Sequence, residues 1–512
     1  MMKKLHILLT LLVFHLLFCP AVAQVNPIIP GFHPDPSVCR VGNDYYLVNS
    51  SFQYFPGVPV FHSTDLQHWR QVGNVLDRAS QLPLRGASSW QGIYAPTIRF
   101  HEGTYYMITT NVNGGGNFMV TAGNPAGPWS EPIWLQQQGI DPSLLFVDGK
   151  CYMVSNPNDA ITLCEIDPQT GRQLTVSRPI WRGTGGRYPE GPHLYFKDGY
   201  YYLLISEGGT ELAHSITIAR SRNIYGPYEA NPANPILTHC NVKGQTSQIQ
   251  GTGHGDLVQA ADGRWWLVFL AYRNYNGSYH HLGRETFIAP VEWPQGGWPV
   301  VNGGQPIEPR QRPAVERRED FDLPLGTEWV YIQNPDKSKY QLSGGRLRLY
   351  GSASTLAANE VPTFVGFRQE SANFQMDTKI AAHHLSDGDE AGLTVYQMHE
   401  GHAQCCLTRD GGSYALKLRM NLKNIHPVLA THTLGSSAGE VWLRVQSDSR
   451  LYHFYYSLDG QHYELLESVD CTLLSTETVG GFTGVMLGLY AFDYEGSHDA
   501  WGDFEYVEYL ER

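Results

Sequence analysis

The hydrophobic pattern of residues 26–313 is that of short strands joined by tight turns. Five times, an alternating apolar run reaches a turn and continues into a second run that begins with aromatic residues. The turns are Gly42-Asn43-Asp44, Glu102-Gly103, Asp148-Gly149, Asp198-Gly199 and Asp262-Gly263. Because Gly and Asn tolerate positive φ, each turn predicts a β-hairpin.

The five hairpins share one register. Asp35 lies eleven residues before Tyr46, and Asp141 lies eleven before Tyr152. The aromatic anchors are 60, 46, 50 and 64 residues apart: Tyr46, Tyr106, Tyr152, Tyr202 and Trp266. A repeat of about 50 residues is typical of propeller blades. We therefore expect residues 24–313 to form a five-bladed β-propeller. The alternative, a sandwich with accidentally similar hairpins, is disfavoured by five copies in register.

Beyond the proline-bounded stretch Pro309–Pro313 the repeat stops, but alternating strands continue. Examples are Gly345–Tyr350, Val441–Val445 and His453–Tyr456, whose apolar and polar positions alternate as in half-exposed antiparallel strands. These predict a β-sandwich over residues 319–512. Helical periodicity is hard to find anywhere, so the chain is predicted to be all-β. The short linker predicts a sandwich that packs against the propeller.

Composition narrows the class of partner. The chain has 512 residues, too many for one ordinary core, and a formal net charge of −13. That charge argues against a nucleic-acid or anionic-membrane partner. The seven cysteines from Cys39 onward show no CxxC spacing, so we expect neither a disulfide framework nor a metal site. The sequence does not determine the oligomeric state.

The first 23 residues have the pattern of a cleavable signal peptide. Lys3 and Lys4 precede a mostly apolar run, Ile7 to Phe18, and Ala21-Val22-Ala23 fits the small-residue cleavage rule. The apolar run is too short for a membrane-spanning helix, so we expect no membrane insertion. The predicted location is secreted or periplasmic.

Three of the repeats carry a carboxylate at or beside the first position: Asp35, Asp141 and Glu190. In a propeller, equivalent positions of successive blades form a ring at one face, so these acids are expected to meet in one axial pocket. Neighbouring buried charges are costly, which favours a functional reason for them. The alternatives are that they cap strand starts or bind a structural cation such as Ca²⁺.

Two carboxylates on either side of a bond are what glycoside hydrolysis requires: one protonates the leaving oxygen, and the other activates water or attacks. A third carboxylate nearby raises an acid's pKa by like-charge repulsion and keeps it protonated. The sequence has no Gly-x-Ser-x-Gly elbow, no phosphate loop and no His-Glu-x-x-His motif. No cofactor is needed for this chemistry.

The chain resembles glycoside hydrolase family 43, which contains β-xylosidases and α-L-arabinofuranosidases. The motifs that carry the resemblance span nearly all of the chain after residue 24: Pro30–Ser37, Gly92–Pro96, Gly139–Ser143, Pro189–His193 and His281–Thr286. The resemblance implies a five-bladed propeller followed by a concanavalin-like jelly roll, and hydrolysis with inversion. It further implies Asp35 as general base, Glu190 as general acid and Asp141 as the residue that tunes and orients Glu190.

Four further residues are candidates for substrate contact. Arg284 resembles the family's substrate-contacting arginine, and His254 resembles an axial histidine that orients the site or approaches a cation. Phe55 and Trp90 are candidates for stacking walls around the sugar. The alternatives are a surface-strand arginine, a buried histidine with satisfied hydrogen bonds, and two core aromatics.

We therefore expect an exo-acting glycosidase that removes terminal β-D-xylose or α-L-arabinofuranose from plant cell-wall oligosaccharides. The sequence does not decide between the two sugars. The alternatives are an endo-arabinanase, a retaining fructosidase-like propeller, and a carbohydrate-binding protein without turnover.

Overall fold

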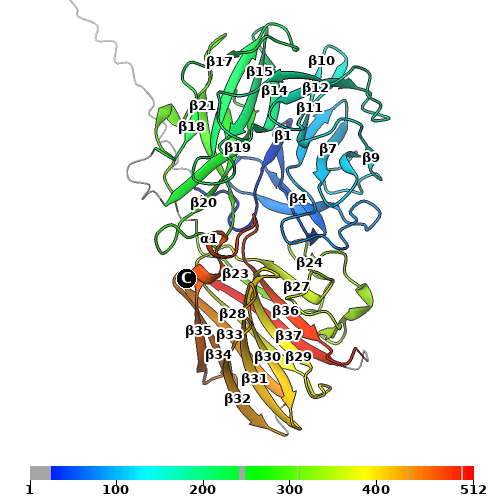
Figure 1. The fold of residues 1–512 in the computed structure, drawn as a ribbon, viewed down its shortest axis with the longest axis vertical. Helices are drawn as coiled ribbons and strands as arrows, with labels where there is room; N and C mark the ends of the chain where they lie inside the picture. The colour runs from blue at the N-terminus through cyan, green and yellow to red at the C-terminus, as the bar shows by residue number, and fades with distance from the viewer. Residues whose placement is uncertain (1–24, 242–247, 311, 437–438, 497–499) are drawn as a thin grey trace, which may run out of the picture.

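The structure is a computed structural model that describes residues 25–241, 248–310, 312–436, 439–496 and 500–512. The predicted signal peptide lies outside these ranges. The chain forms two parts, one drawn blue to green and the other yellow to red (Figure 1). Strands dominate both parts, as predicted. Helix in the described ranges is confined to α1 (Thr476–Val479) and the 3-10 turns η2 (Asn302–Gly304), η3 (Lys337–Lys339) and η4 (Cys471–Leu474).

The first part contains five antiparallel sheets, in each of which the strands lie in chain order, with β3 (Tyr54–Phe55) left out of the first sheet. Sheet one holds β1 (Ser37–Val41), β2 (Asp44–Val48), β4 (Gly57–Ser63) and β5 (Arg70–Leu76). Sheet two holds β6 (Thr97–His101), β7 (Thr104–Asn111), β8 (Gly116–Ala122) and β9 (Ile133–Trp134). Sheet three holds β10 (Ile140–Val147), β11 (Lys150–Asn156), β12 (Ile161–Ile166) and β13 (Arg178–Trp181).

Sheet four holds β14 (Glu190–Lys197), β15 (Tyr200–Glu207), β16 (Ser215–Ser221) and β17 (Glu229–Ala230), with β18 (Leu237–Thr238) also paired to β16. Sheet five holds β19 (Ile249–Gln259), β20 (Trp265–Arg273), β21 (Glu285–Glu292) and β22 (Val300–Val301). The first two strands of every sheet are the predicted hairpins. Their turns contain the expected left-handed glycines, for example Gly42 at φ 64° and Gly149 at φ 72°.

The five sheets follow one another in a closed circle. The first strands β1, β6, β10, β14 and β19 contact one another in that order, and β19 contacts β1. Apolar side chains fill the space between neighbouring sheets: Ile108 and Met119 of sheet two lie with Leu144 and Met153 of sheet three in one buried cluster. The N-terminal segment joins the last sheet, because Ile29 pairs with Thr286 of β21. The repeat therefore produces contacts between sheets far apart in sequence.

The second part consists of two antiparallel sheets, which contain the three strands named in the sequence analysis. One sheet runs β25 (Tyr340–Leu342), β26 (Leu347–Tyr350), β37 (Trp501–Glu511), β28 (Asn373–Ala381), β33 (Glu440–Asp448), β34 (Leu451–Ser457) and β35 (Glu464–Asp470), with β23 (Glu316–Glu319) on β37. The other runs β27 (Thr363–Arg368), β36 (Met486–Phe492), β29 (Glu390–Met398), β30 (Gly401–Asp410), β31 (Ser413–Leu422) and β32 (Val428–Gly435).

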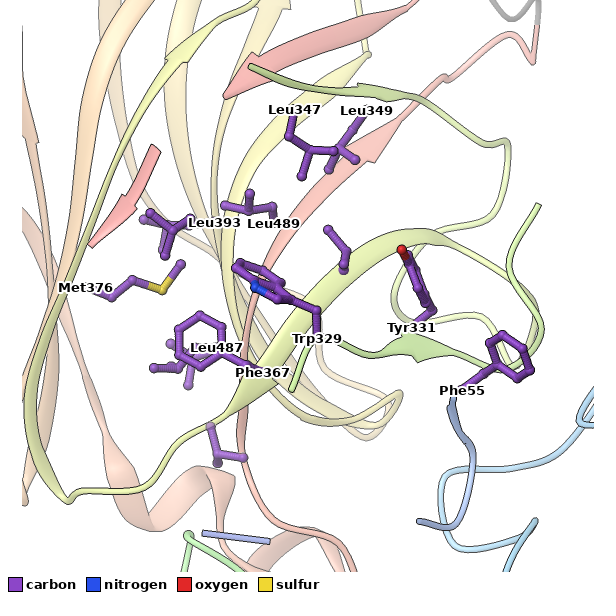
Figure 2. Packing of buried hydrophobic residues seen from close by; sticks show 14 of the residues in the cluster. Phe55, Trp329, Tyr331, Leu347, Leu349, Phe367, Met376, Leu393, Leu487 and Leu489 are labelled. Carbon is purple, nitrogen blue, oxygen red and sulfur yellow. The ribbon is translucent and has the colours of Figure 1, made fainter. Parts of the chain in front are cut away.

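The two parts are packed against each other, as the short linker predicts. Strand β3 (Tyr54–Phe55) of the first part pairs with β24 (Tyr331–Ile332) of the second. Figure 2 shows Phe55 and Tyr331 on facing segments, with Trp329 and Phe367 deeper in the same cluster. The rings of Trp329 and Phe367 meet edge to face at 5.2 Å. This interface is continuous with the core of the second part, so it resembles the interior of one folded unit.

The cysteines of the described ranges are mostly in the core. All seven from Cys39 to Cys471 are free, and all but Cys240 are buried. None of the helices in the described ranges has the length and apolar character needed to span a membrane.

Candidate active site

The structure brings the three predicted carboxylates together. Asp35 lies two residues before β1, Asp141 is the second residue of β10, and Glu190 is the first residue of β14. All three line one cavity of about 80 Å³ at the beginning of the first strands. The other lining residues are Phe52, Tyr94, Ala95, Ile140, Thr210, His254, Arg284 and Phe482.

Backbone irregularities direct these side chains into the cavity. Asp35, Asp141 and His254 have positive φ values of 55°, 53° and 42°, which non-glycine residues seldom adopt. The pairing register shifts near the starts of β10 and β14 and again within β19. Such bulges redirect a side chain relative to the regular pleat, and strained conformations of this kind concentrate at functional sites.

A buried ion-pair network beneath the cavity ties the first strands together. Asp256 of β19 is fully buried and accepts hydrogen bonds from Arg99 of β6 at 2.8 Å and from Tyr195 of β14 at 2.7 Å. It also accepts one from Ser37 of β1 at 2.7 Å. Four of the five first strands thus meet at one carboxylate. Because β14 carries Glu190 and β1 begins two residues after Asp35, the network helps to hold these two acids in place.

Asp35 is held as an anion. Arg284 Nη1 donates to Asp35 Oδ1 at 2.9 Å, and the Ser50 hydroxyl donates to Oδ2. Burial raises the pKa of Asp35, but Arg284, then His254 and Ser50, outweigh burial and bring that pKa below its ordinary value. A buried carboxylate that stays ionised is suited to accept a proton from water.

Asp141 has the opposite environment, with Glu190 as its neighbour. Burial, followed by the charges of Glu190 and Asp35, raises the pKa of Asp141 well above its ordinary value. The Gly191 amide, which donates to Asp141 Oδ2 at 3.1 Å, opposes this rise. The sequence predicted that a neighbouring carboxylate would raise the pKa of the catalytic acid. In the structure this repulsion between like charges raises the pKa of Asp141. The Asp141 carboxyl therefore retains its proton under conditions in which Asp35 is ionised.

Two histidines lie against the acids. His254 Nδ1 is 3.9 Å from Asp35 Oδ1, and burial lowers the pKa of His254 despite the nearby carboxylates. His214, which the sequence analysis did not identify, lies with its Nε2 3.2 Å from Glu190 Oε1 and is almost fully buried. Its Nδ1 contacts the Gly251 carbonyl at 3.3 Å, which requires a hydrogen on that nitrogen. In a neutral ring, Nε2 then carries a lone pair close to Glu190 Oε1.

Part of the cavity wall comes from the second part of the chain. Phe482 follows α1, and its carbonyl accepts a hydrogen bond of 3.4 Å from Arg284 Nη2. The same segment is anchored by Glu477, which accepts from His280 at 2.6 Å, and by Val485, whose amide donates to the His281 carbonyl at 2.9 Å. The C-terminal sheets therefore help to complete the site.

The two aromatic residues predicted as sugar walls are not among the residues that line the cavity. Phe55 belongs to the buried cluster at the interface between the two parts, where Lys337 Nζ lies 5.8 Å from its ring centroid. Trp90 lies beside His399, with ring centroids 6.1 Å apart. The cavity instead has Phe52 and Tyr94, whose rings are 5.2 Å apart. Phe52 has φ 48°, and this left-handed turn sends its side chain into the cavity three positions before Phe55.

Some of the residues that the sequence analysis missed lie in segments that it had identified, and others do not. Phe52 and Tyr94 lie inside stretches already singled out for Phe55 and for the Gly92–Pro96 motif. Phe482 and His214 belong to no repeat or motif, so no local pattern identified them. As for metals, no group of three or more His, Cys, Asp or Glu side chains within the described ranges is placed to hold an ion.

Comparison with known proteins identifies a family for each part of the chain. The family model "Glycosyl hydrolases family 43" matches residues 24–299. The model "Beta xylosidase C-terminal Concanavalin A-like domain" matches residues 318–510. Together these two matches account for most of the chain.

Curated relatives are similar over almost their whole length. A non-reducing end alpha-L-arabinofuranosidase of Bacteroides ovatus is 41% identical over 505 residues, covering 94% of each chain. A beta-xylosidase of Bacillus subtilis is 32% identical over 534 residues, covering 95% of this chain and 99% of the relative. The solved structure of the Bacteroides ovatus xyloglucan PUL GH43B has a TM-score of 0.89 and 40% identity, covering 96% of this chain and all of that one.

Proposed function

This chain belongs to glycosyl hydrolases family 43 and is a glycoside hydrolase, and we propose that it removes single terminal pentoses from hemicellulose-derived oligosaccharides. The proposed sugars are β-D-xylose and α-L-arabinofuranose, in keeping with the names of its relatives. The observation that carries the proposal is the convergence of Asp35, Asp141 and Glu190 in one small cavity. A protein that only binds sugar gains nothing from holding three acids there.

Each acid has a role that suits its surroundings. Asp35, ionised by Arg284 and Ser50, acts as the general base that takes a proton from water. Glu190 acts as the general acid that protonates the leaving oxygen, with His214 Nε2 3.2 Å from its Oε1. Asp141, whose pKa is raised by burial and by the charge of Glu190, lies beside Glu190 and orients it. Attack by water opposite the leaving group inverts the anomeric carbon.

Two features of the cavity support cleavage at the ends of oligosaccharide chains: its small volume and the Phe482 side chain in its wall. Its volume of about 80 Å³ is far below the roughly 300–1,000 Å³ of sites that enclose drug-sized ligands. Phe482, from the second part of the chain, forms part of the cavity wall, so both parts of the chain bound the site. A single terminal residue is therefore the substrate portion that best fits.

We also propose a domain architecture and a cellular location for the enzyme. The closed circle of five sheets is interpreted as a five-bladed propeller over residues 24–313, followed by a jelly-roll sandwich over residues 319–512. The basic and apolar segments before Ala23 are interpreted as a signal peptide, so the enzyme acts outside the cytoplasm. N-terminal sequencing of the exported protein should begin at Gln24, and an intact Met1 terminus would contradict export by cleavage.

Release of nitrophenol from nitrophenyl β-D-xylopyranoside and from nitrophenyl α-L-arabinofuranoside tests the function and decides the sugar. Chain-length analysis of oligosaccharide products tests the mode of attack. Monosaccharide together with a chain shortened by one residue supports the proposal. Internal cleavage products would favour an endo-arabinanase, and binding without turnover of any pentoside would leave a carbohydrate-binding protein.

A further inference from the structure

A second cavity, larger than the catalytic one, lies between the two parts of the chain. Its volume is about 550 Å³, and none of the residues that line it lines the catalytic cavity. One side is formed by the N-terminal segment and by Phe61 to Gln71 of the first sheet. The other side is formed by residues 312–315, Arg317, Thr327, Glu328 and the end of β27. Its rim is exposed at His68, Arg70 and Thr327, so solutes have access to it.

The floor of this cavity contains a buried guanidinium without a full set of partners. Arg368, the last residue of β27, is 4% exposed, and its Nε donates to the Phe32 carbonyl at 2.6 Å. Its Nη2 is buried and has no hydrogen-bond partner among the described residues. An unpaired buried charge is costly, and proteins normally pair it or give it a ligand.

A second guanidinium group, that of Arg317, also has a nitrogen without a hydrogen-bond partner among the residues that the structure describes. Arg317 Nη2 is also buried without a hydrogen-bond partner in the described part of the chain, although Nη1 donates to Glu370 Oε1 at 3.1 Å. Glu370 is already divided between Arg317 and Arg312, whose Nη2 lies 2.9 Å from Oε2. No ion pair within the described ranges joins Arg368 to a carboxylate, and burial lowers the pKa of Arg368 to about 10. The cavity therefore has unused capacity for an anion.

The walls suit a sugar ring. Phe61, Trp69 and Phe367 line the cavity. Phe61 and Phe367 are buried, whereas Trp69 is only partly buried, so its ring is the one on which a pyranose can stack. His33 adds a hydrogen-bond acceptor: its Nδ1 donates to the Pro30 carbonyl at 2.9 Å, and burial, followed by Arg368, lowers its pKa so that the ring is neutral. The remaining ring nitrogen then accepts from a hydroxyl group.

We propose that this cavity binds an acidic sugar, a hexuronic acid or an oligosaccharide that carries one, with its carboxylate on Arg368 and Arg317. A planar carboxylate matches the paired donors of guanidinium groups. A free inorganic oxyanion would satisfy the charge but would leave most of the 550 Å³ and the aromatic walls unused. Acidic substituents on the substrate would thus be held at the interface between the two parts, separate from the residue being cleaved.

The backbone segment that Arg368 contacts also leads to Asp35, the proposed general base. The Phe32 carbonyl that Arg368 holds lies three residues before Asp35. A bound carboxylate that fixes Arg368 also fixes the segment that carries Asp35. A ligand that binds the folded chain and not the unfolded chain stabilises the folded state by mass action. Saturating hexuronic acid should accordingly raise the melting temperature.

Calorimetric titration of the full-length protein with D-glucuronate, D-glucose and inorganic phosphate tests the proposal. Glucuronate should bind, and the two other probes should bind about tenfold more weakly or not at all. Arg368→Met and Arg317→Met should each weaken glucuronate binding about tenfold, and Trp69→Ala should weaken it several-fold. Arg318→Met is the matched control, because Arg318 is exposed on the same strand as Arg317 and its Nε donates to Asp320 at 2.8 Å, outside the cavity.

The outcomes separate this site from the catalytic one. Arg317→Met and Trp69→Ala should hydrolyse nitrophenyl pentosides like the wild type, whatever the true pentose. Equal binding of glucose would refute the role of the carboxylate, and equal binding of phosphate would refute the sugar. Unchanged glucuronate binding in Arg317→Met and Trp69→Ala would refute the location, even if Arg368→Met does not fold.

Discussion

Replacing Arg284 by methionine removes the guanidinium that lies 2.9 Å from Asp35 Oδ1. Both side chains are only 7% exposed, so water cannot take over the lost interaction. Burial then acts on Asp35 with less opposition, and its pKa rises from below its ordinary value. Because the base works only when ionised, activity on the acidic side should be lost.

The size of the shift follows from the neighbours that remain. An adjacent arginine lowers an aspartate pKa by about 1–3 units. His254 and Ser50 still favour the Asp35 anion in the variant, so we expect the smaller half of this range, about 1–2 units. At about 1.4 kcal/mol per unit, that is about 1.4–3 kcal/mol of lost preference for the carboxylate. At pH values above the new pKa, Asp35 is ionised again in the variant. Any activity that is still missing there measures the contacts that Arg284 makes with the substrate.

The assay is the pH dependence of kcat/KM on an activated aryl pentoside, which reports ionisations of the free enzyme. The acidic limb of Arg284→Met should lie about 1–2 units higher than that of the wild type. Arg284→Lys is the matched control, since it keeps the positive charge but loses the second donor, and its limb should move less than half as far. A limb that does not move in Arg284→Met would refute the idea that this ion pair keeps Asp35 ionised.

Three further changes test other parts of the account. Glu190→Ala should cost far more activity on an oligosaccharide, whose leaving group needs a proton, than on an activated aryl pentoside; equal losses in the two rate assays would remove Glu190 from the acid role. Phe482→Ala should raise KM for aryl pentosides about 2–10-fold by removing an aromatic wall, with thermal stability nearly unchanged because the residue is 39% exposed. Phe55→Ala should destabilise the protein by about 3–5 kcal/mol in denaturant unfolding and leave KM unchanged at permissive temperature, whereas a raised KM would return Phe55 to the sugar site.

The hairpins and the acids could be predicted from sequence because both follow from local repetition. Turn residues such as Asp148-Gly149 impose a left-handed turn directly, and the aromatic anchors mark where the second strand begins. Once the register of the repeat is known, Asp35 and Asp141 occupy equivalent places, and a closed circle brings such places together. The positions of these acids therefore follow from the repeat without knowledge of other tertiary contacts.

The walls of the site could not be predicted in the same way. Whether Phe52 or Phe55 faces the sugar depends on a positive φ at Phe52 and on the strand pairing of Phe55 with Tyr331, more than two hundred residues away. Phe482 reaches the cavity only because α1 and its flanking loop pack on His280 and His281. Contacts between parts that do not share a repeat leave no periodic trace in the sequence.

The central claim is that Asp35 activates a water molecule while the leaving group is protonated from the opposite side of the cavity. Proton NMR of the first-formed sugar, recorded before mutarotation, tests it most directly. The account predicts that the pentose appears with the anomeric configuration opposite to that of the substrate. A first product with retained configuration would mean that a carboxylate attacks the sugar itself, and Asp35 could not then be the general base.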